Sequence, residues 1–533
     1  MKSKKILYSA VVAVASVLTF SSCNDFLDTM PDNRTTMDSG DKIADLLTNA
    51  YPTGNDILVN ELMSDNTDYY GATNPNGNRF GDEVYFWQDV METSNDGPEY
   101  FWLEQYQSIA AANEALVDID KLEATHISSE TRTKLEGLRA EALLLRAYGH
   151  FKLVTEFSKM YNPATADKDL GIPVSKQVET LTSKHTRGTV AEVYKAIDED
   201  IQAALPLVND NYRVPKYHFN RKAAYAFAAR FYLYYQKWDK VVECANQVLG
   251  SNPSAVLRDW QVMGNLARGF EAYNQHYISA DLSCNLMLTT KQSEVGVLFG
   301  PYIYFKRYSH GRYLGNMEDL NAQNIWGAAS YYVKPFTGAG NNYDICQVWK
   351  LPYMFEYTDP VLQTGRAHTV NVDFSTDETL LCRAEAYTIL KQYDKACADL
   401  NTWMHNIVQT STTLTPQLIK NFYNSVDYSY DDAAKMASTV KKHLNPTFTI
   451  DAEGSQQETM LQCVLGFRRM ETIHQGLRWD DVNRYRIVIP RRTIGANGTP
   501  LKVTDWLKTD DPRRAVQIPY SIRQAGLEAN PRN

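Results

Sequence analysis

The sequence has few cysteines and none of the motifs that mark the common enzyme classes. Only seven of its 533 residues are cysteine, and their spacing matches neither a zinc site nor a dense disulfide framework. A nucleophile elbow, an HExxH zinc motif, a P-loop and a dinucleotide fingerprint are all missing. The ten histidines are scattered, without partners at metal or triad spacing. We therefore expect no metal, no cofactor and no catalysis.

The sequence also lacks an excess of positive charge and a long apolar segment beyond its N-terminus. The formal net charge is −9 at pH 7, which argues against a nucleic-acid partner because phosphate binding needs a basic face. Beyond residue 20, no segment is long and apolar enough to span a bilayer. We therefore expect attachment to a membrane only through the N-terminal segment.

One apolar run is present, at residues 6–20, and three lysines precede it. It is shorter than the ~20 residues of a spanning helix, so it indicates a secretion signal. Two serines and Cys23 follow, as in the bacterial lipobox, where the cysteine is acylated and becomes the mature N-terminus. We expect residues 1–22 to be a signal peptide and Cys23 to be a stable lipid anchor, since several acyl chains share one residue. The alternative is an ordinary signal peptide followed by a chance cysteine.

Aromatic side chains are abundant, with 34 tyrosines against 19 phenylalanines and nine tryptophans. They concentrate in two glycine-rich and asparagine-rich segments, residues 65–89 and 302–357. Such side chains offer a flat apolar face with a polar edge, which suits wet binding sites. Long ordered loops on a rigid scaffold commonly carry function, so these two segments are the expected ligand face.

An internal repeat indicates the architecture. Residues 228–249 align with residues 382–403, and the alignment places Trp238 over Tyr393. Each copy is a helix rich in small residues, a tight turn that begins with an aromatic residue, and a second helix. This is the layout of a tetratricopeptide unit, in which neither helix can bury its apolar stripe alone. The copies lie much further apart than the 34-residue tandem period of those arrays.

Other helices complete a mainly α prediction. We expect them at residues 100–120, 129–158, 189–205 and 458–476. Three helix starts carry capping boxes: Thr189 with Glu192, Ser375 with Glu378, and Ser455 with Glu458. Three cysteines within helical patterns are interpreted as small core residues: Cys244, Cys382 and Cys397. The expected single domain, residues 23–533, has a helical scaffold at about 40–250 and 376–486, an irregular insert at 251–375 and an irregular tail at 487–533.

These features together resemble the SusD/RagB family of Bacteroidetes outer-membrane lipoproteins. The likeness rests on motifs in a fixed order along nearly the whole chain: "CNDFLD" after the lipobox serines, "RAEALLLRAYGHFKL" (139–153), "GIPV" (171–174), "TRGTVAEVYKAIDEDIQAAL" (186–205) and "RRMETIHQGLRWDDVNRYR" (468–486). Gln475 and Leu477 depart from the family, which usually has glutamate and often histidine at these positions.

The resemblance implies a helical tetratricopeptide-like scaffold that carries an irregular ligand-binding face. It also implies a partner, a SusC-like TonB-dependent β-barrel transporter, on which such lipoproteins sit as a hinged lid. The acidic and amide residues directly after Cys23 suit the surface-export signal of these bacteria. The implied location is the outer membrane, lipid-anchored and facing the cell exterior.

Candidate ligand contacts follow from what a neutral sugar requires. The ring needs an apolar plate, and its hydroxyls need planar amide, carboxylate or guanidinium groups around the rim. Two tryptophans in the aromatic segments have such neighbours, and further candidates are chosen on composition. The predicted contacts are Trp87, Gln88, Asp89, Arg312, Tyr313, Asn324, Trp326 and Tyr331. The alternative is that these aromatics only pack the insert against the helices.

The predicted function is that of a non-catalytic surface lipoprotein that binds an oligosaccharide or polysaccharide and delivers it to the transporter. Three alternatives stay open. The lid could bind peptide instead of glycan, or the helical repeats could form a protein-interaction scaffold. A surface glycoside hydrolase is the third, because its two carboxylic acids need only be close in space.

Overall fold

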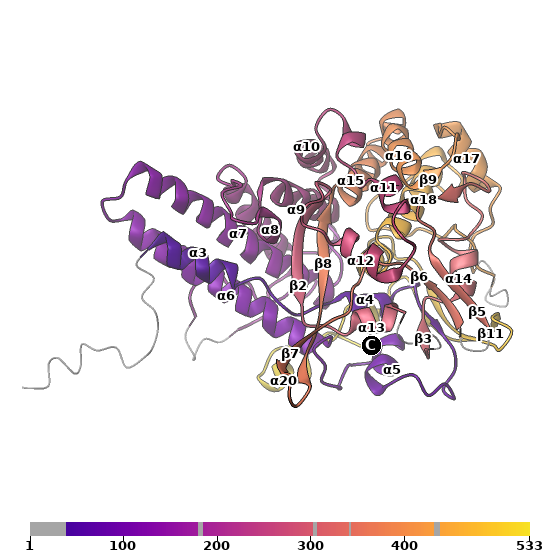
Figure 1. The fold of residues 1–533 in the computed structure, drawn as a ribbon, viewed down its shortest axis with the longest axis horizontal. Coiled ribbons are helices and arrows are strands. Elements are labelled where there is room, and N and C mark those ends of the chain that lie inside the picture. Colours follow the sequence, from indigo (N-terminus) through magenta and orange to yellow (C-terminus); the bar gives the residue numbers. More distant parts are fainter. Residues whose placement is uncertain (1–38, 180–184, 302–305, 341–342, 431–436, 533) are drawn as a thin grey trace, which may run out of the picture.

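The computed structural model describes residues 39–179, 185–301, 306–340, 343–430 and 437–532. The predicted signal peptide and Cys23 lie outside the described residues. Helices are the main regular element of the described chain, and small sheets lie in the middle and at the right of Figure 1, so the mainly α prediction is confirmed. Among the described helices, none combines the length and the apolarity that crossing a membrane requires.

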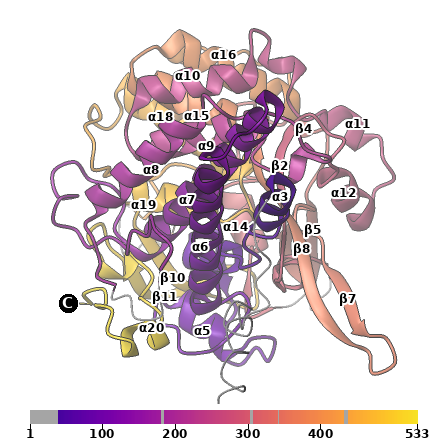
Figure 2. The same cartoon turned by 90° about the vertical axis from the view of Figure 1, so that its left-hand side faces the viewer.

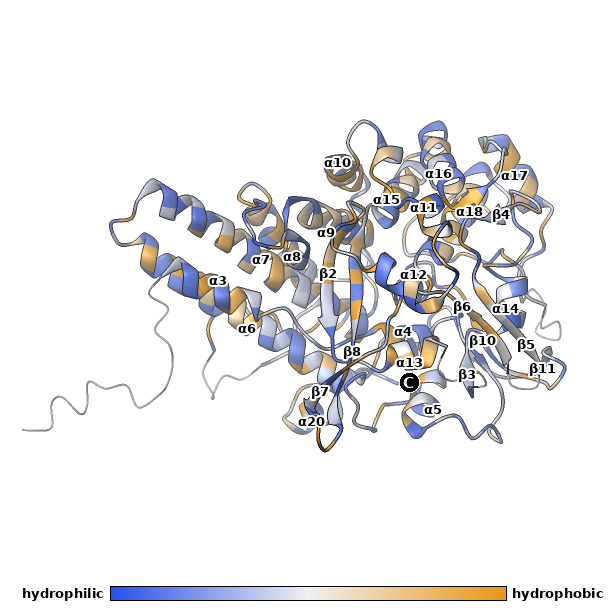
Figure 3. Ribbon diagram, viewed as in Figure 1, coloured by the Kyte–Doolittle hydropathy of each residue, from blue (hydrophilic) through white to orange (hydrophobic). Residues whose placement is uncertain are grey.

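Two long helices form the elongated arm at the left of Figure 1. These helices, α6 (Pro98–Glu123) and α7 (Ser129–Phe157), pack along each other. The short helix α3 (Gly40–Thr48) lies against both, and α8 (Val190–Ala204) packs on α7. Hydrophobic and hydrophilic residues both recur along them (Figure 3), and their inward positions include the fully buried Ile109 and Leu144. The elements of this part are α3 (Gly40–Thr48), α4 (Ile57–Met63), α5 (Arg79–Tyr85), α6 (Pro98–Glu123), α7 (Ser129–Phe157) and α8 (Val190–Ala204).

Local capping explains where several helices begin. At the start of α8 the predicted box is complete, because Glu192 N–H donates to Thr189 Oγ1 at 3.2 Å and Thr189 N–H donates to Glu192 Oε2 at 2.8 Å. The other two predicted boxes are only half formed. Their serines cap the helix, but the glutamates turn elsewhere: Glu378 pairs with Arg230 and Glu458 accepts from Gly454 N–H. A distant arginine thus replaces the local return bond at the first of these starts, whereas at the second the glutamate bonds the residue directly before the cap.

The internal repeat folds as two helix–turn–helix pairs that stack on each other through α10 and α15. The two turns have the same geometry: Gln236 and Lys391 adopt φ of 60° and 58°. The next residue in each turn, Lys237 or Gln392, donates its N–H to a carbonyl five residues back. The helices here are α9 (Arg221–Tyr234), α10 (Trp238–Leu249), α15 (Thr376–Ile389), α16 (Tyr393–Ile407), α17 (Pro416–Asn424), α18 (Gln456–Glu471) and α19 (Leu477–Arg484).

Residues 251–375 are more regular than expected. They form short helices and a three-stranded antiparallel sheet of order β2-β8-β7, in which Leu288 is the partner of Val372. These strands could not be predicted from the sequence pattern, because β2 is buried on both faces and shows no alternation of polar and apolar residues. The elements are η2 (Pro253–Ala255), α11 (Trp260–Gly264), α12 (Phe270–Tyr277), β2 (Asn285–Lys291), α13 (Val295–Phe299), α14 (Arg312–Met317), β4 (Ser330–Tyr331), β5 (Phe336–Gly340), β6 (Tyr343–Gln347), β7 (Met354–Asp359) and β8 (Thr364–Ser375). Two short elements lie outside this segment, η1 (Pro215–Tyr217) before it and β9 (Val408–Gln409) after it.

The C-terminal segment corrects the prediction of an irregular tail. Its two strands join a four-stranded sheet of order β11-β10-β1-β3. In that sheet Tyr69 pairs in parallel with Thr493 and antiparallel with Tyr308. The sheet therefore brings three distant parts of the chain to one place. The remaining elements are β1 (Asp68–Tyr69), β3 (Tyr308–Ser309), β10 (Ile489–Ile494), β11 (Pro500–Leu507), η3 (Pro512–Arg514) and α20 (Tyr520–Gln524).

Buried charge ties the insert to the scaffold. Glu318 lies 2.6 Å from Lys442 and 3.1 Å from both Arg469 and Arg492. Burial by itself raises the pKa of Glu318, but the three cations hold it well below its ordinary value. The six described cysteines are free and buried, which confirms the core role predicted for Cys244, Cys382 and Cys397.

Candidate functional site

The eight predicted contacts do not form one site. Trp87, Gln88 and Asp89 directly follow α5 and line a surface hollow. Arg312 and Tyr313 lie on α14, and the other three lie between α14 and the end of β4. We treat the hollow beside α5 as the candidate site because it alone gathers several of the predicted residues.

This hollow, which we call the α5–β11 hollow, is open and has a volume of about 550 Å³. Its walls come from the end of α5, the strand β11, the turn at η3 and the C-terminal residues. The chain reaches one place from these distant positions because β10 pairs with β1 and β11 pairs with β10 in the four-stranded sheet. The lining residues are Phe86, Trp87, Gln88, Asp89, Thr504, Asp505, Arg513 and Arg532.

Trp87 is the floor of the hollow. Its backbone takes a left-handed φ of 54° directly after α5, and its indole Nε1–H donates to the Met63 carbonyl at 2.9 Å. The side chain is 3 % exposed, because the Arg491 guanidinium lies 3.8 Å and the Arg513 guanidinium 5.3 Å from the ring centre. Trp87 therefore supports the site and does not present the open plate that the sequence suggested.

Phe86 supplies the accessible aromatic wall. It is half-buried, and its ring lies 5.3 Å from that of Tyr69 in an edge-to-face arrangement. Tyr69 in turn stacks on Tyr308 at 5.5 Å, so the aromatic packing continues from the half-buried Tyr69 to the buried Tyr308. Phe86 was not among the predicted contacts, although it directly precedes Trp87, because the larger tryptophan ring is the more evident surface on which a sugar stacks.

The polar rim carries balanced charge. Asp89 accepts from Arg532 at 3.0 Å, and Asp505 accepts from Arg513 at 2.5 Å. Arg513 also bonds Asp511, and that hydrogen bond is the largest cause of the raised pKa of Arg513. Two carboxylates thus face two guanidinium groups in the lining, so the hollow favours a neutral ligand over a charged one. Gln88 is exposed beside them.

Trp326 and its neighbours are buried, which is against their predicted role as ligand contacts. Trp326 is 7 % exposed, and its ring packs 5.5 Å from that of Phe467 on α18. Asn324 Oδ1 accepts from the Ile325 N–H, and the Tyr331 hydroxyl donates to the Leu320 carbonyl at 2.7 Å. These side chains attach the insert to α18, because the apolar face of that helix needs cover.

Tyr313 and Arg312 also lie away from the hollow. The Tyr313 ring is half-buried, and the Arg492 guanidinium lies 4.9 Å from its centre. Arg491 and Arg492 are neighbours on β10, yet Arg491 contacts Trp87 whereas Arg492 contacts Asp68 and Tyr313. Each of the two predicted aromatics therefore rests on its own arginine.

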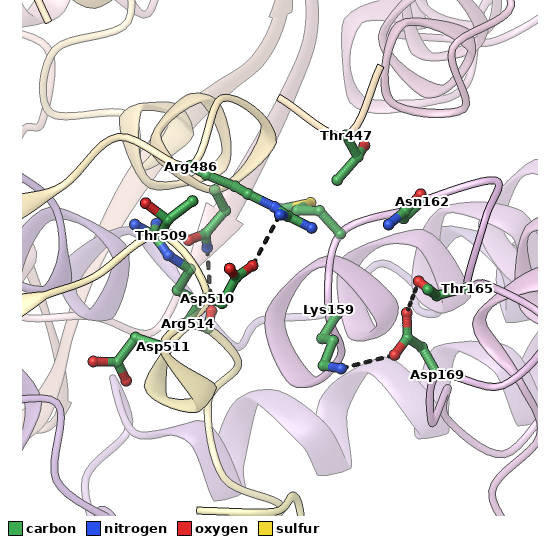
Figure 4. Close-up of a pocket in the computed structure, with 12 residues that line it drawn as sticks. Lys159, Asn162, Thr165, Asp169, Thr447, Arg486, Thr509, Asp510, Asp511 and Arg514 are labelled. Atoms are coloured by element: carbon green, nitrogen blue, oxygen red, sulfur yellow. Dashed lines mark hydrogen bonds and ion pairs between the residues drawn. The ribbon is translucent and has the colours of Figure 1, made fainter. Parts of the chain in front are cut away.

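A smaller hollow, of about 260 Å³, lies between the end of α7 and the turn before η3. Figure 4 shows Lys159 and Arg486 pointing at their aspartate partners, at 2.8 Å from Asp169 and 2.9 Å from Asp510. Its lining contains no aromatic side chain, so it does not offer a sugar ring a plate. Within the residues that the structure describes, no group of three or more His, Cys, Asp or Glu side chains is placed to hold a metal ion.

Comparison with known proteins gives one family and one fold. Residues 25–233 match the SusD-like family whose description reads "Starch-binding associating with outer membrane". No curated protein matches the chain. The fold is similar to that of a SusD superfamily protein from Bacteroides thetaiotaomicron, with 18% identity and a TM-score of 0.62 over 93% of this chain and 100% of that one.

Two structures from Bacteroides vulgatus are similar to nearly the same extent. A putative sugar binding protein shares 18% identity at a TM-score of 0.61, over 93% of this chain and 99% of that one. A SusD-like carbohydrate binding protein shares 16% identity at a TM-score of 0.57, over 91% of this chain and 96% of that one. At identities of 16–18%, these structures are evidence for the fold alone.

Proposed function

We propose that this chain, whose residues 25–233 match the SusD-like family and whose fold is similar to that of a SusD superfamily protein, is a surface lipoprotein that binds a glycan without altering it and passes it to a SusC-like TonB-dependent transporter. The family description names starch binding and the outer membrane, and two similar structures are titled sugar or carbohydrate binding. The observation that carries the proposal is the α5–β11 hollow, which combines an aromatic wall, a polar rim and balanced charge.

The chemistry of the hollow fits a sugar ring. The exposed part of Phe86 receives the C–H face of the ring, and Gln88, Asp89 and Arg532 donate to or accept from its hydroxyls. One ring contact of about 0.5–1.5 kcal/mol and about four hydrogen bonds of about 1 kcal/mol each give roughly −4.5 to −5.5 kcal/mol. That range corresponds to a Kd of roughly 0.1 to 0.5 mM. Weak binding suits a protein that must release its cargo, and tethering beside a transporter raises the effective concentration.

The carboxylates of the hollow are arranged for contact and not for bond cleavage. A glycosidase needs one acid to donate a proton and a second to act as base or nucleophile. Here Asp89 lies 3.0 Å from Arg532 and Asp505 lies 2.5 Å from Arg513. One oxygen of each carboxylate already accepts from a guanidinium donor, so the arrangement favours binding over hydrolysis.

An exposed hairpin supports the proposal of a protein partner. The β7–β8 hairpin projects from the body (Figure 2), and its tip carries Val361 at 90 % and Leu362 at 71 % exposure, with Tyr357 at 56 % on the strand behind. Exposed apolar surface of this kind commonly marks an interaction site. We propose that the transporter covers this tip, and Val361→Ser with Leu362→Ser is expected to reduce co-purification with it.

The anchor is a separate part of the proposal. Acylated Cys23 would hold the body on the outer membrane, facing the cell exterior. Cys23→Ala is expected to move the protein from the membrane fraction to the soluble fraction and to remove it from the surface. Unchanged fractionation would overturn the lipid anchor and leave the glycan site untouched.

The glycan site is tested by affinity electrophoresis of the form that starts after Cys23, in gels containing amylopectin, arabinoxylan, galactan or mucin glycans. At least one polysaccharide is expected to retard the protein, and Phe86→Ala with Gln88→Ala is expected to remove the retardation. The matched control is Phe355→Ala with Gln275→Ala, two exposed residues of the same types outside the hollow. New reducing ends would favour a glycoside hydrolase, and retention by peptide without any glycan response would favour a peptide-binding lid.

A further inference from the structure

A third hollow lies at the other end of the molecule from the α5–β11 hollow. It has a volume of about 730 Å³ and is enclosed by α3, the first half of α7 and the loop that leads into η1. We call it the α3–α7 hollow. In Figure 1, α3 and α7 lie at the left, whereas α5 and β11 lie to the right, and the two hollows share no lining residue.

The loop presents a tyrosine ring to this hollow. Tyr212 is half-buried and lines the hollow, and its ring lies parallel to the His218 imidazole, with 4.3 Å between centroids and 8° between planes. The imidazole covers one face of the phenol ring. The described ring contacts of Tyr212 are with His218 alone, and Tyr212 is not part of the hydrophobic core. Because Tyr212 lines the hollow and is only half-buried, part of its ring can contact a ligand there.

A buried carboxylate holds this stacked pair in place. Glu141 is 1 % exposed, and its Oε1 accepts from His218 Nδ1 and from the Tyr51 hydroxyl, both at 2.8 Å. The Tyr51 hydroxyl in turn accepts from the Phe219 N–H at 2.7 Å, which fixes the chain next to His218. The plate is thus rigid before any ligand arrives, and a preorganised plate loses little conformational freedom on binding.

The rim of the α3–α7 hollow has the polar groups that a sugar requires. The amides of Asn209 and Asn211 and the guanidinium of Arg213 lie on the same loop as Tyr212, and Glu130 and Lys134 face them from α7. Lys134 is already paired with Asp41 on α3. Charges of both signs are present, so the hollow suits a neutral ligand rich in hydroxyls.

We propose that the α3–α7 hollow is a second carbohydrate-binding site, in which a neutral sugar ring stacks on the exposed part of the Tyr212 ring while Asn209, Asn211 and Arg213 bond its hydroxyls. The ligand class rests on the function proposed above. Two separate sites on one body bind a long polysaccharide more tightly than a short oligosaccharide, because the second contact is intramolecular. The preference for polymer over oligomer is thus a property of the pair of sites.

The test uses the soluble form that starts after Cys23, with the polysaccharide that retards it in affinity gels as the probe. Tyr212→Ala is expected to weaken retention at least fivefold, whereas Tyr212→Trp, which keeps a plate, retains it. Tyr217→Ala is the matched control, since Tyr217 is 39 % exposed on the same loop but does not line the hollow. Hydroxyl-radical footprinting is expected to show protection of Tyr212 by the probe in the wild-type protein.

The outcomes separate this proposal from the function above. Retention that depends on Phe86 and Gln88 but not on Tyr212, with no protection of Tyr212, overturns the second site and leaves the function standing. If Tyr212→Ala loses retention and the Phe86 and Gln88 variant keeps it, the result supports the α3–α7 hollow and shows that the hollow beside α5 is not the glycan site. If Tyr212→Ala does not fold, Asn211→Ala and the footprint decide. Retention by none of the four polysaccharides overturns both proposals.

Discussion

The guanidinium of Arg491 lies 3.8 Å from the centre of the Trp87 ring and 4.0 Å from that of Tyr85. Arg491 is fully buried, and its hydrogen bonds run to main-chain carbonyls, those of Leu62, Met63, Ser64 and Tyr85. One side chain of β10 therefore fixes the ends of α4 and α5 and the floor of the α5–β11 hollow.

Removing this guanidinium is expected to damage both stability and binding. In Arg491→Met four buried carbonyl groups lose a donor, so the free energy of unfolding falls by about 3 kcal/mol or more. Arg491→Lys keeps the charge but loses the several planar N–H donors of the guanidinium, so its free energy of unfolding is expected to lie between those of the wild type and Arg491→Met. Urea unfolding measures the change, and affinity gels measure the loss of glycan retention. An unfolding midpoint equal to that of the wild type would show that Arg491 does not organise the site.

Alanine variants of Gln88 and Trp326 are expected to have opposite effects, the first on glycan affinity and the second on stability. Gln88→Ala removes an exposed amide from the rim, so glycan affinity falls about fivefold, or about 1 kcal/mol, with unchanged stability. Trp326→Ala leaves a cavity against α18, so stability falls by about 3 kcal/mol while the folded protein keeps its affinity. Affinity gels and urea unfolding on both variants provide the comparison, with Gln275→Ala as the exposed glutamine control. The reverse pattern would place the ligand at Trp326.

His150 is expected to make the fold sensitive to acid. It is 1 % exposed; its Nε2 accepts from the Ser175 N–H at 3.1 Å, so Nδ1 carries the proton toward the Arg146 carbonyl at 2.9 Å. Burial lowers the pKa of His150 from 6.5 to about 4. A pKa lowered in the folded state contributes stability that is complete above pH 6.5 and is lost as the pH falls toward 4, by about 3 kcal/mol in total.

The pH dependence is isolated by a variant that cannot titrate. His150→Gln offers a donor and an acceptor, so its unfolding free energy is expected to fall less steeply between pH 6.5 and 4 than that of the wild type. The difference between the two slopes is the measurement, because other buried groups titrate equally in both proteins. Parallel slopes would mean that burial does not lower the pKa of His150 in the folded state.

The turn between α15 and α16 is expected to prefer glycine. Lys391 has a φ of 58°, a region in which a Cβ is unfavourable. Lys391→Gly and Lys391→Ala both lose the exposed contact with Asp451, so their difference reports the backbone alone, and the glycine variant should be more stable by about 1 kcal/mol. At the exposed Lys395 inside α16, the order is expected to reverse. Thermal or urea unfolding of the four variants checks this.

The helical scaffold could be predicted because its signals are local. The stripe and cap residues of α8 lie within a few positions of one another, and the turn at Lys391 repeats the turn at Gln236. The strands of the insert and the C-terminal segment were not predicted. Strand β10 pairs with β1, which lies at the other end of the chain, and such pairing leaves no periodic trace in either segment.

The site was predicted only in part. The combination of aromatic and polar residues led to Trp87, Gln88 and Asp89, which line the α5–β11 hollow, but the same combination led to Trp326, which is buried against Phe467. Composition cannot tell these cases apart, because the exposure of a ring depends on what packs on it from elsewhere in the chain. Arg513 and Arg532 were missed for the same reason.

By itself, the sequence determined the mainly helical class, the paired helices and the likeness to one family, because helix periodicity, caps and motif order are properties of neighbouring residues. Only the tertiary structure decided which aromatic rings stay open and which arginines neutralise the carboxylates beside them. Those properties arise when β10 and β11 lie beside β1 and α5 and when a loop closes over α7, and contacts between distant segments have no local signature.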